Sequence, residues 1–533
     1  MDLKQIITEG KTAIGIELGS TRLKSVLIDN NFTPIASGTH DWENIFTDGV
    51  WTYNLDDVWK GVQNSFCSLS SDVKEKYGVE LTVTGAIGVS AMMHGYLAFN
   101  KSGNQLAQFR TWRNTSTEKA ATLLTEKFNF NIPLRWSIAH LYQAMLNNES
   151  HVKDISFITT LAGYVHWKLT GKKAIGINDA SGMFPVDTAT QNYNSLMLEQ
   201  FSKITSSYNY NWKITEILPE IINAGDEAGT LTPEGSRLLS PNGSLKPGIP
   251  LCPPEGDAGT GMIATNSIKE KTGNVSAGTS IFAMIVLEKD LSKVYPQIDI
   301  VLTPAGKSVA MVHCNNCTSD IDAWIRLFFE ITECTGSKID KNALYSLLYN
   351  KALEADSDCG RLLSYNYYSG EPLSGIEEGR PLLTRLPDGN FTLANFMRTL
   401  LFSAFGTLKY GMDILTEKEN VTIKSLLGHG GMFKTKIVSQ KLMAAALNTP
   451  VSVMESSAAE GGAWGISLLA AFMLQKTNGC VSLEQFLEEK VFININSEKI
   501  EPDPDDVKSF NNYMERYAAG LIIEKAAVEN FKK

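Results

Sequence analysis

Short apolar runs of strand length, each interrupted by a polar turn, recur along the chain. Residues 12–30 consist of one strand-like run, the turn Gly19-Ser20-Thr21 and a second strand-like run. Residues 272–287 repeat this pattern about half a chain later, around Gly278-Thr279-Ser280. A repeat at half-length predicts two domains of related fold, each opening with a β-hairpin.

The tips of both predicted hairpins have the chemistry of a small anion site. At Gly19, Ser20 and Thr21, and again at Gly278 and Thr279, successive backbone N–H groups and hydroxyls can face one side. A polar tip of this kind is also typical of any hairpin. Two of them facing one cleft would hold a polyphosphate from both sides. No Gly-x-x-x-x-Gly-Lys-Ser/Thr stretch occurs, which excludes a P-loop nucleotidase.

Between the hairpins the pattern is mixed α/β. Residues 81–89 predict a strand that ends in the glycine-terminated loop 90–95, a favoured ligand position in α/β sheets. His94 in that loop is a candidate substrate contact, although a single histidine more often has a structural role. Trp112 either stacks on a sugar face or simply packs. The remaining predictions are a loop at 111–117, helices at 118–128 and 157–170, and a loop at 178–183.

The second half continues with helices at 320–330 and 396–415. A strand at 425–427 runs into Gly428-His429-Gly430-Gly431, and a helix follows over 434–447. This order leaves room for a flat ring or a phosphate against bare backbone, although a glycine cluster alone is also typical of a plain tight turn. Further helices are predicted at 458–474 and 507–528.

Near the middle of the chain, residues 253–261 are rich in Gly and Pro and predict a tight, exposed turn. Asp257 lies inside this stretch. Flanking glycines let a substrate approach the carboxylate, as a general base requires. For an isolated Gly-Asp pair, a solvated turn residue is the alternative.

Composition and charge narrow the class of protein. Hydrophobic residues at 43% and charged residues at 20% are typical of a globular protein of 533 residues. The net charge of -10 disfavours sequence-independent binding of nucleic acid. No secretory signal is seen at the N-terminus, and the longest apolar run, at 465–474, is too short to span a bilayer. We therefore predict a cytoplasmic protein without membrane or nucleic-acid partners.

Seven scattered cysteines suit a reducing compartment. Cys314 and Cys317 form a Cys-x-x-Cys pair beside His313. A structural zinc site needs further ligands at matching spacing, and no second pair follows. A metal or redox role is therefore disfavoured.

The order of these motifs resembles the FGGY family of carbohydrate kinases over nearly the whole chain. The resemblance rests on six segments: residues 15–21 (first phosphate motif), 276–280 (second phosphate motif), 428–431 (adenosine motif), 90–95 (the Met-His-Gly loop of xylulokinases), 179–182 (Asp-Ala-Ser-Gly) and 256–257 (catalytic base). It implies an α/β, two-domain sugar kinase, hexokinase and actin ATPase fold (ribonuclease H-like), with the ligand cleft between the domains. We expect the sugar-binding domain with the first phosphate motif at 1–265, and the ATP-binding domain at 266–533.

The resemblance implies ATP-dependent phosphorylation of a sugar hydroxyl, most simply of a ketopentose such as xylulose. It implies these roles: Asp257 as catalytic base; Met93, His94, Trp112 and Asp257 as sugar contacts; Gly19, Ser20, Thr21, Gly278, Thr279, Gly430, Gly431 and Lys434 as ATP contacts; and Glu17 as the residue that binds Mg²⁺ through water. The alternatives are a kinase acting on another ketose, deoxysugar or polyol, and a non-catalytic actin-like ATPase relative. The oligomeric state stays open, with a homodimer as one alternative.

Three residues depart from the family pattern. Glu17 replaces the usual Asp and is one methylene longer, so metal geometry or the rate with ATP is expected to differ. In the Trp112 loop, Asn114 replaces Asp and the usual Arg is missing, which bears on the choice of sugar. His429 replaces a usual Gly, which alters the wall expected near adenine or ribose.

Overall fold

The computed structural model describes residues 2–454, 461–476, 482–493, 495 and 497–532, which pack as two compact units. Unit 1 comprises Met1–Ile268, Asp299–Val309 and Ser456–Ile495, and unit 2 comprises Lys269–Ile298, Ala310–Glu455 and Asn496–Lys533. The units thus alternate along the chain, whereas the sequence-based prediction has one boundary between residues 265 and 266. The assignment of sugar binding and ATP binding to the domains 1–265 and 266–533 stays a prediction.

A five-stranded sheet forms the centre of unit 1, in the order β13-β6-β1-β2-β3. Its strands are β1 (Ala13–Leu18), β2 (Arg22–Ile28), β3 (Pro34–Asp41), β6 (Ala86–Ala91) and β13 (Glu255–Gly256). β1 pairs antiparallel with β2 and parallel with β6, and β13 pairs parallel with β6. The first predicted hairpin is therefore confirmed.

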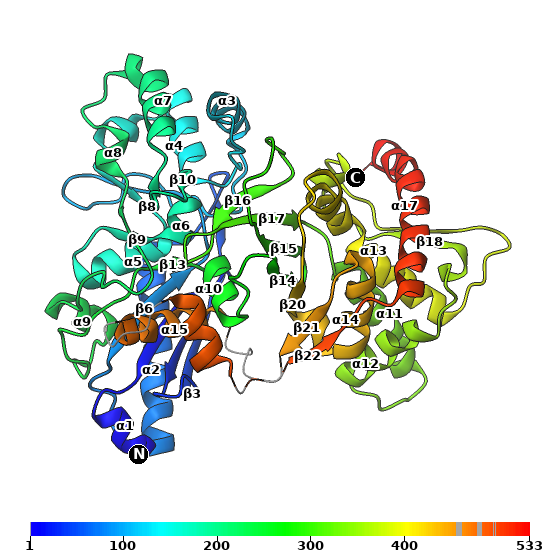
Figure 1. The fold of residues 1–533 in the computed structure, drawn as a ribbon, viewed down its shortest axis with the longest axis horizontal. Helices are drawn as coiled ribbons and strands as arrows, with labels where there is room; N and C mark the ends of the chain where they lie inside the picture. The colour runs from blue at the N-terminus through cyan, green and yellow to red at the C-terminus, as the bar shows by residue number, and fades with distance from the viewer. Residues whose placement is uncertain (1, 455–460, 477–481, 494, 496, 533) are drawn as a thin grey trace. The chain divides into compact units, whose positions relative to one another are not determined.

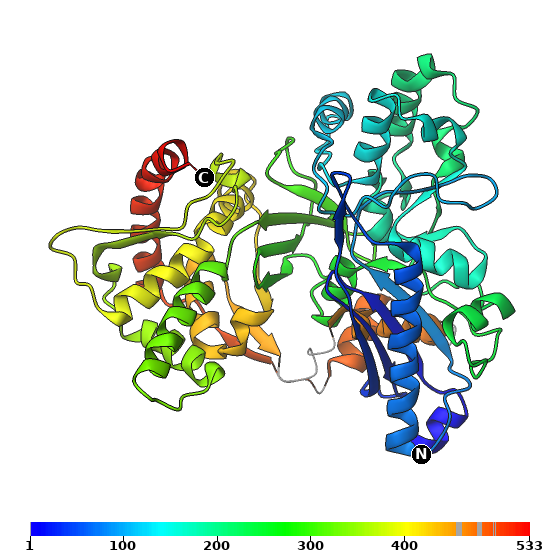
Figure 2. The same cartoon turned by 180° about the vertical axis from the view of Figure 1, so that it is seen from behind.

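Two helices cover opposite faces of this sheet. A Cβ on Gly15 of β1 would lie 2.0 Å from the Ala463 carbonyl oxygen of α15 (Gly461–Lys476), and one on Gly38 of β3 would lie 2.2 Å from Leu69 of α2 (Leu55–Tyr77). These two glycines lie in adjacent rows of the sheet, so they face opposite sides. Figure 1 shows α15 in orange across one face, and Figure 2 shows α2 in blue across the other. Both glycines are needed because the helix backbones approach so closely.

Smaller elements complete unit 1. They are α1 (Leu3–Thr8), β4 (Ile45–Thr47), β5 (Val50–Thr52), β7 (Leu97–Phe99), α3 (Glu118–Phe128), α4 (Ser137–Leu146), β8 (Phe157–Thr159), α5 (Leu161–Thr170), β9 (Ala174–Gly176), α6 (Ile177–Ser181), β10 (Val186–Asp187), β11 (Asn192–Tyr193), α7 (Ser195–Thr205), α8 (Ile214–Ile217), β12 (Glu220–Ile222), α9 (Pro233–Leu239), α10 (Asp257–Ala264), β16 (Asp299–Leu302) and α16 (Leu483–Phe486).

In unit 2, strands β17, β15, β14, β20, β21 and β22 lie side by side in that order. Their bounds are β14 (Thr272–Ala277), β15 (Ile281–Val286), β17 (Ser308–Cys314), β20 (Ser425–His429), β21 (Val451–Met454) and β22 (Ser497–Ile500). β14 and β15 form the second predicted hairpin, which is confirmed, and β14 pairs parallel with β20. The other elements are α11 (Ser319–Cys334), α12 (Lys341–Lys351), β18 (Leu362–Tyr365), β19 (Leu382–Arg385), α13 (Leu393–Asp413), α14 (Lys436–Leu447) and α17 (Pro504–Asn530).

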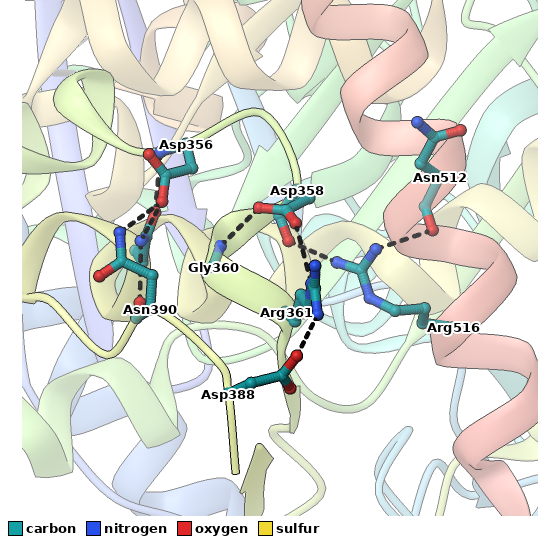
Figure 3. A network of polar contacts seen from close by, with 9 residues as sticks. Asp356, Asp358, Gly360, Arg361, Asp388, Asn390, Asn512 and Arg516 are labelled. Atoms are coloured by element: carbon teal, nitrogen blue, oxygen red, sulfur yellow. Dashed lines mark hydrogen bonds and ion pairs between the residues drawn. The ribbon is translucent and has the colours of Figure 1, made fainter. Parts of the chain in front are cut away.

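A polar network ties the long C-terminal helix α17 to a strained turn of unit 2. Cys359, Gly360 and Arg361 have consecutive φ values of +54°, +59° and +59°, a region that favours glycine. Figure 3 shows the contacts around this turn: the Arg516 guanidinium of α17 donates to the Asp358 carbonyl at 2.7 Å, and Arg361 donates to Asp388 at 2.6 Å. These bonds tie the turn to α17 and to Asp388.

Four predicted elements differ from the structure. The strand predicted at 81–89 is β6, which begins at Ala86 and includes Ser90 and Ala91. The helix predicted at 157–170 begins only at Leu161, because residues 157–159 form β8. The loop predicted at 178–183 overlaps α6, which begins at Ile177, and the turn predicted at 253–261 holds β13 and the start of α10. In the last two, burial of polar and small residues overrides their preference for turns.

Two helix starts also shift. The helix predicted from Lys434 begins at Lys436 after a single 3₁₀ turn at Gly431–Lys434. The first residues of the helix predicted at 458–474 lie outside the described residues. In the part of the chain that the structure describes, no helix combines the length and hydropathy that a membrane crossing needs.

Candidate functional site

Three neighbouring parallel strands of unit 1 end at one edge of the sheet. Glu17 of β1, Ser90 of β6 and Glu255 of β13 occupy one row, since both glutamates pair with Ser90. Met93 lies two residues beyond the end of β6, and Asp257 follows β13 directly. The carboxyl end of a parallel sheet is where α/β proteins place ligands, so these residues mark a candidate active site.

Asp257 is held at this edge by backbone hydrogen bonds. Its Oδ1 accepts the Met93 N–H at 3.0 Å and the Ala258 N–H at 2.9 Å. Burial raises the pKa of the carboxyl group above its usual range. Asp257 is the first residue of helix α10 and is partly buried. The prediction that it lies in an exposed turn was wrong.

Glu17 lies against the first turn of α15. Its Oε2 accepts the Ala463 N–H at 3.0 Å, and a Cβ on Gly462 would lie 2.3 Å from Oε1, so only glycine fits there. Burial, and after it the negative charge of Asp257, raise the pKa of Glu17 to about 7. The Glu17 and Asp257 carboxyl groups therefore repel each other electrostatically.

The donor set suits a magnesium ion held mainly by phosphate and water. Among the described residues, no three His, Cys, Asp or Glu side chains are grouped to hold a metal by themselves. Mg²⁺ typically takes one or two carboxylates and completes its shell with water and substrate phosphates. Glu17 and Asp257 provide two carboxylates whose mutual repulsion a cation would relieve, so the residues fit this ion.

The predicted sugar loop follows β6 in a left-handed conformation. His94 and Gly95 have φ values of +71° and +89°. The Gly95 N–H donates to the Arg135 carbonyl at 3.2 Å, and the Ser137 hydroxyl donates to the Gly95 carbonyl at 2.5 Å. His94 Nδ1 lies 3.2 Å from the Gly182 carbonyl oxygen. The structure thus brings Met93 and His94 together with Asp257.

Sequence reasoning gave no site role to a buried acid pair beneath the loop. Glu255 Oε2 accepts the Asp179 N–H at 3.0 Å, and the Thr160 hydroxyl donates to Asp179 Oδ2 at 2.5 Å. Burial raises the pKa of Asp179 to about 8 and that of Glu255 well above its usual range. Burial therefore favours the protonated form of both carboxyl groups, and the Asp179 N–H bond to Glu255 holds α6 against β13. The Asp-Ala-Ser-Gly segment had marked Asp179, whereas nothing local marked Glu255.

Aromatic side chains hold the tip of the first hairpin. The Trp112 indole N–H donates to the Ser20 hydroxyl at 3.2 Å, the Trp42 indole N–H donates to the Gly19 carbonyl at 2.7 Å, and the Tyr53 hydroxyl donates to the Ser20 carbonyl at 2.6 Å. Trp112 therefore joins its loop to the predicted phosphate tip. Gly19 and Ser20 are half-buried, and Thr21 is exposed.

Asn114, the family departure in this loop, is used by the fold. Its side-chain amide donates to the Trp51 carbonyl at 2.7 Å, and its oxygen accepts the Trp51 N–H at 2.9 Å. The side chain is buried and pins the β4–β5 hairpin to the loop. An Asn suits this place better than an Asp, because it both donates and accepts.

In unit 2, the second hairpin tip and the glycine loop lie together. Ser276 of β14 pairs with His429 of β20, and a Cβ on Gly430, at φ +99°, would lie 2.5 Å from the Ala277 carbonyl oxygen. Gly430 therefore touches the hairpin at the residue before Gly278. Thr279 and Gly431 are exposed beside this contact. This is bare backbone at a strand end, as nucleotide binding requires.

The remaining predicted nucleotide residues flank this edge. Lys434 is exposed at the end of the 3₁₀ turn that follows Gly430. Burial lowers the pKa of His429 to about 4, so its imidazole is neutral near pH 7. His429 thus gives no positive charge for phosphate binding.

Comparison with known families decides the class of protein. Residues 12–263 match the model described as "FGGY family of carbohydrate kinases, N-terminal domain", and residues 273–474 match its C-terminal counterpart. The chain belongs to the FGGY family of carbohydrate kinases. It is therefore an enzyme of that family, and FGGY kinases use ATP as phosphate donor.

Individual FGGY kinases resemble the chain over nearly all its length. The xylulose kinase of Haemophilus influenzae is 23% identical over 525 residues, which cover 95% of this chain and 99% of that one. The solved xylulose kinase of Lactobacillus acidophilus has a TM-score of 0.78 at 16% identity and covers 98% and 100% of the two chains. A gluconate kinase of the same organism reaches the same TM-score and identity, with 98% and 99% covered. The FGGY fold is thus confirmed, and the fold alone does not choose the sugar.

Proposed function

We propose that this FGGY kinase transfers the γ-phosphate of ATP to a hydroxyl of a ketopentose such as xylulose. The observation that carries the proposal is Asp257, oriented by the Met93 amide at the carboxyl end of β13, next to the His94 loop. A carboxylate with a raised pKa in a partly buried position is suited to general base catalysis.

Asp257 would take the proton of the sugar hydroxyl as its oxygen attacks the γ-phosphorus. The bond from that oxygen to phosphorus forms, the bond from phosphorus to the bridging oxygen of ATP breaks, and ADP leaves. Met93 and His94 would contact the sugar. In this proposal the first hairpin tip (Gly19, Ser20, Thr21) contacts phosphate, and the unit 2 residues Gly278, Thr279, Gly430, Gly431 and Lys434 contact the nucleotide.

Glu17 would hold Mg²⁺ through water, beside Asp257. The ion, when bound, neutralises charge that develops on the phosphate oxygens. Glu17 Oε2 accepts the Ala463 N–H, and this hydrogen bond fixes the orientation of the side chain for this role.

The charge of the site favours an uncharged sugar over a sugar acid. Glu17 and Asp257 already repel each other. The two arginines that flank the sugar loop are paired, Arg135 with Asp299 and Arg110 with Glu149. A substrate carboxylate would meet negative charge here, so gluconate should be a poor substrate. The similarity to a xylulose kinase, which is 23% identical and covers 95% of this chain, supports a ketopentose more specifically.

Release of ADP from Mg²⁺-ATP, measured against xylulose, ribulose, deoxysugars, polyols and gluconate, tests the proposal. We expect a ketopentose to stimulate release in the wild type, and gluconate to give no stimulation. A polyol or deoxysugar as the preferred substrate would replace the ketopentose. No stimulation by any sugar would point to a non-catalytic relative.

The state of the cysteines bears on the cellular compartment in which the enzyme acts. The six described cysteines are free thiols, as a reducing compartment allows. We propose that the enzyme acts in the cytoplasm.

A further inference from the structure

The Cys314-x-x-Cys317 segment of unit 2 has a structural use that needs no metal. Both cysteines are buried free thiols. Burial raises the pKa of both, so they stay protonated and are poor metal ligands or nucleophiles. The segment is instead distinguished by what its backbone contacts.

Two backbone N–H groups at the end of this segment hold the second hairpin tip. The Cys317 N–H donates to the Thr279 carbonyl at 3.0 Å, and the Thr318 N–H donates to the Gly278 carbonyl at 3.1 Å. With these carbonyls engaged, the tip has a fixed backbone orientation. The Cys317 carbonyl is fixed in turn, since it accepts from the Asn366 side chain at 2.9 Å.

The two residues between the cysteines converge on one buried carboxylate. Oε2 of Glu371, a side chain with no exposed surface, accepts the Asn315 N–H at 3.0 Å, the Asn316 N–H at 3.3 Å and the Asn316 side-chain amide at 3.1 Å. The Asn316 oxygen accepts the N–H groups of Tyr368 and Ser369 at 2.9 and 3.0 Å. Glu371 therefore organises the segment that supports the hairpin tip.

We propose that Glu371 is a positioning residue for nucleotide binding: it fixes Asn315-Asn316, and through Cys317 and Thr318 it fixes the Gly278-Thr279 tip. The inference rests on the proposed function, in which that tip contacts ATP. A carboxylate that accepts several N–H groups forms stronger bonds than a neutral amide. Loss of its charge therefore loosens the tip and weakens nucleotide binding, with sugar binding unaffected.

The charge state of Glu371 gives this role a measurable pH dependence. Burial raises its pKa to about 7, and the hydrogen bonds from Asn316 and Asn315 oppose that rise. Two neighbouring titratable groups, the Cys314 thiol and the Tyr367 phenol, interact electrostatically with Glu371. The pKa values of both groups are raised, so neither the Cys314 thiol nor the Tyr367 phenol adds a charge change between pH 6 and 8.

Glu371→Gln is the test, with ADP binding measured by calorimetry and KM for ATP and sugar measured by ADP release. At pH 8 we expect the dissociation constant of ADP and KM for ATP to rise roughly tenfold, with KM for the sugar within about twofold. At pH 6 the ratio between variant and wild type should fall towards one, because the wild-type carboxyl is then protonated. Titration of the nucleotide itself cancels in this ratio.

Glu524→Gln is the matched control. Glu524 of α17 also has no exposed surface, accepts a backbone N–H (Arg380, 2.7 Å) and has a pKa raised to about 7 by burial. Its hydrogen bond is to the backbone of Arg380, not to the hairpin tip or the Cys314–Thr318 segment. We expect the control to change stability and to leave ADP binding at the wild-type value.

The inference is overturned if folded Glu371→Gln binds ADP as the wild type does, if Glu524→Gln weakens ADP equally, or if the ratio is independent of pH. If Glu371→Gln does not fold, Asn316→Ser replaces it, with the same expected separation of ATP and sugar KM. A wild type that binds ADP but phosphorylates no sugar refutes the proposed function alone. A wild type that binds no ADP refutes both.

Discussion

At the scale of single residues, the orientation of Asp257 is the feature with the most direct chemical meaning. Two backbone N–H groups donate to the same oxygen, Oδ1, and so fix the plane of the carboxylate. Because the carboxylate is already oriented, less conformational entropy is lost when it aligns with a substrate hydroxyl, which lowers the activation barrier.

Asp257→Asn should therefore lower kcat by about 10²- to 10⁴-fold, the usual contribution of a general base. Binding of ADP should stay within about twofold, because the amide keeps the size and the Met93 bond. Asp179→Asn is the control: Asp179 is already neutral near pH 7, so its amide should cost far less activity. Equal losses in both variants would make Asp257 a structural residue.

Glu17 should give the folding stability a defined pH dependence. Its pKa rises from 4.5 to about 7 on folding, so the folded state binds the proton more tightly than the unfolded state. Its contribution is thus fully present below pH 4.5 and is lost as pH rises through 7. Glu17→Gln should raise the free energy of unfolding by about 3 kcal/mol at pH 8 and by almost nothing near pH 4.5.

Urea unfolding at both pH values, without added metal, measures this difference. The Gln oxygen still accepts the Ala463 N–H, so the substitution removes only the charge. A gain of the same size at both pH values would contradict the electrostatic account.

The sequence predicted the participants of the site better than their surroundings. Asp257, Met93 and His94 were expected near a ligand, and the structure brings them together. The row that aligns Glu17 with Ser90 and Glu255 depends on strand register, which no local pattern reveals. For the same reason Glu255 was not predicted. Its raised pKa arises from burial, which is a property of the whole fold.

At the scale of elements, the contact between β14 and the loop after β20 depends on one glycine. Gly430→Ala would place a methyl group 2.5 Å from a backbone carbonyl, at a φ of +99° that L residues rarely adopt. We expect it to lower stability by about 1 to 3 kcal/mol and to raise KM for ATP.

Gly431→Ala separates binding from folding in the same loop. A Cβ there has open space around it, so stability should not change. If Gly431 contacts the nucleotide, KM for ATP should still rise. Thermal melting and KM, measured on both variants, check this pair; equal melting temperatures for Gly430→Ala and wild type would contradict the steric argument.

Helices and hairpins with strong local signals were predicted well. Helix α3 has the predicted bounds, Glu118–Phe128, and both hairpins turn at the expected Gly-Ser-Thr and Gly-Thr-Ser tips. Helix α10 was not predicted, because Gly259 and Gly261 argue locally against a helix. The structure explains Gly259: a Cβ there would lie 2.3 Å from Asn178 Oδ1. Close packing, which is non-local, outweighs helix propensity at this point.

At the scale of the whole molecule, the chain passes several times between two units, so neither unit is one continuous segment. Helix α15, from residues 461–476, packs on β1 and β6 of unit 1, and its Ala463 N–H donates to the Glu17 carboxyl group. A fragment of residues 1–265 lacks this helix and leaves one face of the sheet uncovered.

We therefore expect the fragment 1–265 to be unstable alone, with little cooperative melting by circular dichroism. Fusion of residues 456–495 to its C-terminus through a flexible linker should restore a cooperative transition. Cooperative melting of the fragment 1–265 without α15 would show that the helix is dispensable for the core.

The late position of α15 in the chain also has a consequence for biosynthesis. The strand that carries Glu17 emerges early from the ribosome, but its covering helix belongs to a segment that ends at residue 495. At typical rates of synthesis, roughly 10 to 50 s separate the emergence of the first 268 residues from that of the last segment of unit 1. During this interval the nascent sheet has an exposed apolar face, which makes it a natural client for chaperones that bind unfinished domains.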